Sequence, residues 1–140
     1  MNYGRLVLAA VVAMVVDLIY GFAVFGMALG NVMSVAPGVY RPLDAVTQHL
    51  PAMFGGTLLG MLAATAIYAK GYEGKSGLGE GVRFGLLVAI FSAGYFVIAG
   101  SAVMNYGLKL AAIMSVAGVG EWIIVGATIG LLYKPAAAAK

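Results

Sequence analysis

The sequence predicts an all-α integral membrane protein, a four-helix bundle with both termini in the cytoplasm. Of its 140 residues, 63% are apolar and only 9% are charged, whereas a soluble domain carries about 25% charged residues. The apolar residues gather into four runs long enough to cross a bilayer. Basic residues lie mainly at the ends of these runs, where membrane anchoring requires them. This composition excludes a soluble globule, a disordered chain and a nucleic-acid-binding module.

The first two predicted spans cover residues 6–30 and 50–69. A spanning helix needs about 20 apolar residues, and both runs meet this length, the first with one charge, Asp17. Because the apolar run continues well past Asp17, we expect a membrane span here rather than a cleaved signal peptide. The connection between these spans is the longest of the three, and residues 42–50 are predicted to form a short interfacial helix that ends near Pro51.

The third and fourth predicted spans cover residues 84–104 and 110–133. The third run carries no charge, and the fourth is interrupted only by Glu121. The connection before the third span, residues 71–81, is rich in glycine and is predicted to be a flexible loop. Only a few residues separate the third span from the fourth, so these two helices should form a tight antiparallel hairpin.

The charges that flank the spans predict the orientation of the chain. Six Lys and Arg residues lie on the side of the termini and two on the other side. The six are Arg5, Lys70, Lys75, Arg83, Lys134 and Lys140. Because short loops rich in Lys and Arg stay in the cytoplasm, we expect both termini there. The spans should form one domain, residues 1–134, followed by a short tail, residues 135–140.

Glycines spaced by four residues predict where helices approach closely. Lipid tails are as apolar as leucine, so the close packing of small residues does much of the work of helix association in membranes. The spaced pairs are Gly26/Gly30, Gly56/Gly60 and Gly126/Gly130. We expect these pairs to form contacts inside the bundle; the alternative is that one of them forms the seam of a homodimer.

Two acidic residues, Asp17 and Glu121, lie near the middle of their spans. With a rise of about 1.5 Å per residue, each lies roughly 15 Å or more from either end of its helix. An acid at this depth costs about 2.5–3.5 kcal/mol if it faces lipid, so both should face the bundle interior or a wet cavity. Small residues share their helix faces, which would let the first and fourth spans approach and the two acids meet.

No basic residue lies at the depth of these acids, and the single histidine, His49, lies near the outer edge. Within one chain, therefore, no direct ion pair should neutralise them. We expect at least one acid to carry a proton at neutral pH, or a cation to be bound. Three hydroxyl-bearing residues in the membrane, Tyr20, Ser92 and Tyr95, can donate hydrogen bonds to a carboxylate. The predicted ligand or proton site comprises Asp17, Glu121, Tyr20, Ser92 and Tyr95.

The function predicted from this site is the binding or transport of a ligand linked to a proton or cation. In the alternative, the chain is a structural or accessory subunit, and the acids fasten helices by hydrogen bonds or meet a partner. We expect no enzyme, because the chain lacks cysteine and has no serine–histidine–acid set at one depth. No cofactor and no metal are predicted. The expected partners are the lipid bilayer and a second copy or a larger membrane complex, but no nucleic acid.

Three stretches of the sequence resemble those of uncharacterised small bacterial membrane proteins with four spans. They are Gly38-Val-Tyr-Arg-Pro42, Tyr68-Ala-Lys-Gly-Tyr-Glu-Gly74 and Glu80-Gly-Val-Arg-Phe-Gly85. The resemblance covers most of the chain and implies a bacterial inner membrane, but no activity. The plan is also similar to that of small multidrug-resistance exporters, which have four short helices and an essential acid in the first. That likeness rests on Asp17 and the helix count alone, and the second deep acid, Glu121, departs from that family's pattern.

Overall fold

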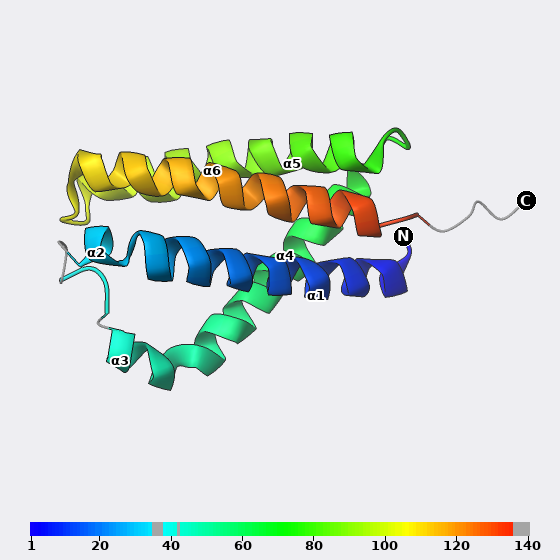
Figure 1. Ribbon diagram of the computed structural model, residues 1–140. Coiled ribbons are helices and arrows are strands. Elements are labelled where there is room, and N and C mark those ends of the chain that lie inside the picture. Colours follow the sequence, from blue (N-terminus) through cyan, green and yellow to red (C-terminus); the bar gives the residue numbers. More distant parts are fainter. Residues whose placement is uncertain (35–37, 42, 136–140) are drawn as a thin grey trace, which may run out of the picture.

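The computed structural model shows an all-helical chain. It describes residues 1–34, 38–41 and 43–135, and no strand occurs among them. Four helices in these ranges are long and apolar enough to cross a membrane. They are Tyr3–Ala28, Asp44–Lys70, Gly77–Ala102 and Gly107–Leu132. The predicted all-α fold with four candidate spans is therefore confirmed, and both ends of the chain lie at the same end of the molecule (Figure 1).

The first span is a composite helix. It begins as α1 (Tyr3–Tyr20), continues as a π-helix, η1 (Gly21–Ala28), and is followed by one short turn, α2 (Gly30–Met33). The side chain of Asn2 accepts a hydrogen bond from the backbone N–H of Arg5 (3.2 Å), so the helix starts three residues before the predicted boundary.

The second span is longer than predicted. A short helix, α3 (Leu43–Val46), and a 3₁₀ turn, η2 (Thr47–His49), lead directly into α4 (Leu50–Lys70). A short helical segment within residues 42–50 is therefore present as predicted, but it is not separate from the span: it leads straight into α4, and Pro51 lies in the first turn of α4, where its missing N–H removes no hydrogen bond. Pro42, the predicted start of that helix, lies outside the described residues.

The third span also starts earlier than predicted. It consists of α5 (Gly77–Ser92), a π-helix, η3 (Ala93–Ile98), and a 3₁₀ turn, η4 (Gly100–Ala102). The side chain of Ser76 caps α5 by accepting a hydrogen bond from the N–H of Gly79 (3.4 Å). The fourth span, α6 (Gly107–Leu132), follows closely. Residues 136–140 of the predicted tail lie outside the described residues.

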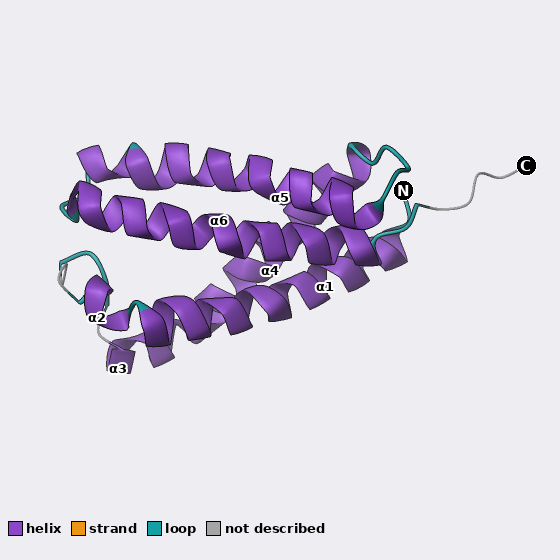
Figure 2. Cartoon of the chain, turned by 45° about the horizontal axis from the view of Figure 1, so that its top comes forward, coloured by secondary structure: helices purple, strands orange, loops and turns teal. Residues whose placement is uncertain are grey.

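Glycines hold α5 and α6 together, and Figure 2 shows these two helices side by side along their length. Gly77, Gly81 and Gly85 lie directly on the backbone of α6. A Cβ atom on Gly81 would overlap the carbonyl oxygen of Gly126, and one on Gly85 would overlap that of Trp122. The predicted loop, residues 71–81, is therefore shorter than expected: residues 71–76 are not helical, whereas residues 77–81 belong to α5, because backbone packing offsets the low helix propensity of glycine.

Only one of the three predicted glycine pairs lies in a contact between helices. Gly126 and Gly130 pack against α5, whereas an added Cβ atom at Gly30, Gly56 or Gly60 would meet nothing within 4 Å. A Cβ atom on the remaining member, Gly26, would touch only its own helix. Among the described residues, the first and second pairs therefore lie in no close contact between helices, which corrects the prediction for them.

The core lies at the end that carries the termini. Helix α4 crosses α1 obliquely there and diverges from it toward α3 (Figure 1). The core residues all have hydrophobic side chains, and each is at most 8% exposed. They are Leu6, Ala9, Ala10, Ala13, Met61, Ala64, Tyr68, Val125, Ile129 and Tyr133. The ring of Tyr133 packs edge-on against the rings of Tyr68 and Tyr72.

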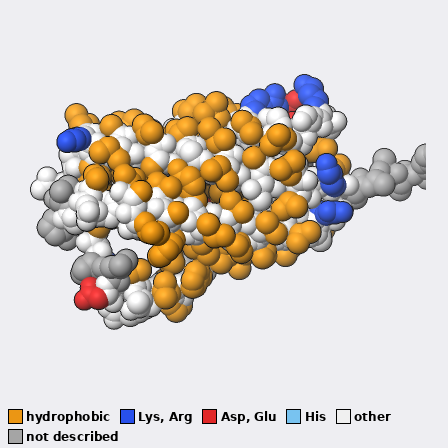
Figure 3. All heavy atoms as spheres, in the orientation of Figure 1, with side chains coloured by type: hydrophobic (Ala, Val, Ile, Leu, Met, Phe, Trp, Pro, Cys, Tyr) orange, Lys and Arg blue, Asp and Glu red, His pale blue; other side chains and the backbone are white. Residues whose placement is uncertain are grey.

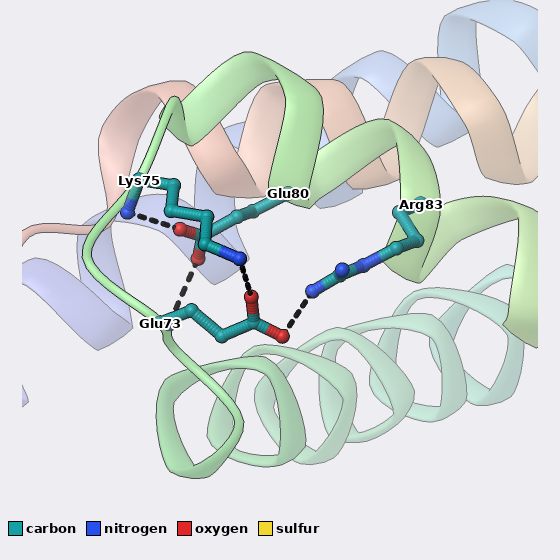
Figure 4. A network of polar contacts seen from close by, with 4 residues as sticks. All are labelled: Glu73, Lys75, Glu80 and Arg83. Atoms are coloured by element: carbon teal, nitrogen blue, oxygen red, sulfur yellow. Dashed lines mark hydrogen bonds and ion pairs between the residues drawn. The ribbon is translucent and has the colours of Figure 1, made fainter.

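The loop between α4 and α5 is tied to α5 rather than free (Figure 4). The carboxylate of Glu80, only 7% exposed, accepts hydrogen bonds from the backbone N–H groups of Glu73 (3.0 Å) and Lys75. The side chain of Glu73 pairs with Lys75 (2.9 Å) and with Arg83. The ammonium of Lys75 and the guanidinium of Arg83 hold the pKa of Glu73 below its usual range.

The surface divides by charge along the long axis. Figure 3 shows most of the visible Lys and Arg atoms at the end with the termini and a smaller group of charged atoms at the opposite end, with hydrophobic side chains over most of the length between them. A broad apolar surface of this kind is the one that a lipid bilayer covers.

Candidate functional site

The two deep acids lie on the facing sides of α1 and α6, which pack against each other as antiparallel neighbours. One turn nearer the termini, Ala13 and Val125 are fully buried in the shared core. Asp17 lies one turn beyond Ala13, and Glu121 lies one turn before Val125. The same register therefore brings Asp17 and Glu121 to one level, where the tight core ends and both side chains are half-buried.

Tyr20 closes the space beside these acids. Its hydroxyl donates a hydrogen bond to the carbonyl oxygen of Ala117 on α6 (2.8 Å). A Cβ atom on Gly120 would lie only 2.6 Å from that hydroxyl oxygen, so the tyrosine would have to shift if this position carried a side chain. The sequence reasoning missed Gly120, because its role depends on the register of α1 against α6.

Tyr20 lies about one helical turn from the acids: it follows Asp17 by three residues on α1, and its acceptor Ala117 precedes Glu121 by four residues on α6. Within residues 1–34, 38–41 and 43–135, both ion pairs belong to Glu73, and neither deep acid has a basic partner. The same residues hold no group of three or more His, Cys, Asp or Glu side chains that could share a metal ion.

The other two predicted site residues lie apart from the acids. Tyr95 is 67% exposed, and its ring stacks on Phe91 with 5.8 Å between the ring centres. Ser92 is half-buried at the end of α5. The structure therefore brings together Asp17, Glu121 and Tyr20, but not Tyr95 or Ser92.

Ser92 lies instead beside a residue that sequence reasoning missed. Two turns before Ser92, Gly85 packs on Trp122, so the antiparallel register places Ser92 at the level of Ser115. The hydroxyl oxygen of Ser115 is buried and has no hydrogen-bond partner among the described residues. This level is about 9 Å along α6 from Glu121, which is six residues away. The glycines that pack between α5 and α6 set the register of these helices, and they were the signal that could have shown Ser92 and Ser115 to lie at one level.

A shallow apolar cavity of about 420 Å³, open to the outside of the molecule, lies between the first span and the first half of α6. Its lining residues all carry apolar side chains: Val24, Leu29, Ala112, Ile113, Val116 and Ala117. Ala117 is also the acceptor of the Tyr20 hydroxyl, so Tyr20 marks the boundary between this cavity and the two acids. Neither acid lines the cavity.

Two π-helices surround this part of α6. Helix η1 begins directly after Tyr20, and η3 begins directly after Ser92. Both contact α6, and neither contains a buried residue. π-Helical turns are rare and frequently lie at functional sites, so this loosely packed half of the molecule is the place where a ligand or a conformational change is most readily accommodated.

Comparisons of this chain with protein-family models, with curated proteins and with solved structures show no match.

Proposed function

We propose that this chain is a membrane protein that binds a proton or a cation between Asp17 and Glu121 and links it to the binding or transport of a ligand. The observation that carries the proposal is the meeting of two half-buried acids with no basic partner among the described residues. An intramembrane acid is a functional-site candidate by default. Its burial costs free energy, so such residues are rare and usually have a role in function. The two acids are the groups that gain and lose protons, and Tyr20 separates them from the apolar cavity.

The proposal places the site in a bacterial inner membrane, with both termini in the cytoplasm. Its support is the gathering of basic side chains at the end with the termini. Since the chain has no cysteine, single variants Lys75→Cys and Lys109→Cys give a clean topology test. A maleimide that does not cross membranes should label position 109 in intact spheroplasts, and position 75 only after the membrane is opened.

Proton release on cation binding tests the site itself. In weakly buffered detergent solution, addition of Na⁺, K⁺, guanidinium or tetraethylammonium should release protons from the protein if a cation displaces them from the acids. Asp17→Asn and Glu121→Gln should abolish the release, whereas Asp44→Asn, an exposed acid outside the site, should leave it intact. Absence of release with all four cations would reject a cation-linked site.

A second candidate function is that of a structural or accessory subunit. It is favoured by the first half of α4, where Pro51–Gly56 are all exposed. In this case Asp17→Asn and Glu121→Gln lower the melting temperature or dissociate an assembly and leave ion flux in proteoliposomes unchanged. The size of the particle in mild detergent, measured for the wild type and for each variant, separates the two candidates: dissociation on substitution favours the subunit role.

A further inference from the structure

A second pocket, of about 180 Å³, lies at the end with the termini, between the last turns of α4 and the first turns of α5. Its membrane-facing wall includes Ile67 and Leu87, which are 64% and 63% exposed. Its other wall includes Tyr68, Glu80 and Arg83. The pocket is therefore apolar on one side and polar on the other, at the depth where a lipid headgroup meets its acyl chains.

Tyr68 carries a hydroxyl group without a hydrogen-bond partner. The residue is only 4% exposed, and its oxygen is buried and unpaired among the described residues. The nearby Glu80 does not serve it, because the carboxylate of Glu80 accepts hydrogen bonds from the backbone of Glu73 and Lys75. Buried hydroxyl groups are normally paired. A group seated in the pocket could pair with this one after a small side-chain adjustment.

Arg83 supplies a positive charge on the same wall. Its side chain is 56% exposed, and one of its nitrogens pairs with Glu73. A guanidinium has five N–H donors, so donors remain for a second anion. Lys70, the last residue of α4, is exposed one residue before Gly71 of the pocket. An arginine is well suited to phosphate, because its planar N–H groups match two phosphate oxygens at once.

We propose that this pocket binds an anionic phospholipid. The phosphate accepts hydrogen bonds from Arg83 and from the hydroxyl of Tyr68, and an acyl chain lies along Ile67 and Leu87. The proposal does not depend on the deep acids, since none of the residues that line this pocket belongs to their site.

The variant Tyr68→Phe tests the proposal, because the substitution should not lower the melting temperature without lipid but should weaken the stabilisation that the lipid gives. Without added lipid, removal of an unpaired buried hydroxyl should leave the melting temperature in detergent unchanged or raise it. On addition of phosphatidylglycerol, the wild-type melting temperature should rise more than with phosphatidylcholine, and Tyr68→Phe should lose most of that difference. Arg83→Gln should lose it as well. Native mass spectrometry should show fewer phosphatidylglycerol molecules retained by both variants.

Two variants serve as matched controls. Thr65→Val removes another buried, unpaired hydroxyl from α4, but Thr65 does not line the pocket. Arg5→Gln removes a positive charge from the same end of the molecule. Both should keep the full response to phosphatidylglycerol. The proposal is overturned if Tyr68→Phe keeps that response, if the controls lose it equally, or if inorganic phosphate alone reproduces it, since the site would then be one for a soluble anion.

Discussion

The half of the molecule that carries the termini differs from the opposite half in how its helices meet. In the first half, Ala9, Ala10 and Ala13 have no exposed surface, and α5 lies on the backbone of α6. In the second half, η1 and η3 contain no buried residue, and α4 has turned away (Figure 1). The acids Asp17 and Glu121 lie at the boundary. Small residues thus build a rigid half, and the polar groups lie where that rigidity ends.

The largest effect should come from a methyl group in the tight half. Gly81→Ala places a Cβ atom on the carbonyl of Gly126, so α5 and α6 must separate. We expect a loss of about 3 kcal/mol or more in the free energy of unfolding, at the upper end of overpacking effects. Gly60→Ala is the matched control, because its Cβ atom meets nothing within 4 Å, and it should stabilise α4 by up to about 1 kcal/mol. Equal effects in unfolding by a denaturing detergent would refute the difference between the two halves.

A smaller effect should follow from loosening the loop of the tight half. Glu80→Gln removes the charge that accepts hydrogen bonds from the backbone of Glu73 and Lys75. Hydrogen bonds to charged groups contribute about 1.5–3 kcal/mol, so we expect a loss within this range and faster proteolysis between α4 and α5. Asp44→Asn, which removes an exposed acid at the far end, should change neither quantity. Unchanged proteolysis in Glu80→Gln would show that this carboxylate does not hold the loop.

The boundary between the halves is tested at Gly120. Gly120→Ala should displace the hydroxyl of Tyr20 from the carbonyl of Ala117 and destabilise the chain by about 0.5–1.5 kcal/mol, the usual contribution of one hydrogen bond. Gly118→Ala, two residues away with nothing within 4 Å, is the control. In the background of Tyr20→Phe the effect of Gly120→Ala should shrink. If it does not, the glycine has another role.

The smallest effect concerns the exposed ion pairs of Glu73. Because Lys75 and Arg83 lower the pKa of Glu73 in the folded state, its contribution to stability is present above its ordinary value of 4.5 and is lost as pH falls through the lowered value. The difference in melting temperature between wild type and Glu73→Gln should therefore be small at pH 7, should vanish in acid, and should shrink in high salt. A difference that grows on acidification would contradict this sign.

Composition and apolar runs were enough to predict four helices, because a lipid-facing helix needs little beyond length and hydropathy. The same information misplaced the start of α5, because glycine-rich sequence usually predicts a loop and only the backbone of α6 reveals why Gly77–Gly85 is helical. Helix propensity is a local property, whereas this packing joins segments about 40 residues apart in the chain.

For the candidate site, the adjacency of α1 and α6 followed from small residues near Asp17 and Glu121, and the structure places these helices together. The exposure of Tyr95 could not be predicted in this way, because the depth of a residue in the membrane does not determine which side of the helix it occupies. Ser115 and Gly120 were missed for a related reason: their surroundings depend on register between helices, which no single run of sequence contains.

The divergence of α4 from α1 gives the molecule a wedge shape (Figure 1). In a bilayer, such a wedge takes up more area in one leaflet than in the other. The work of seating it then varies with membrane tension and spontaneous curvature, and any motion that swings α4 toward α1 would change the protein's footprint. A membrane whose curvature expands the leaflet around the wide end would therefore fit this shape better than a membrane curved the other way.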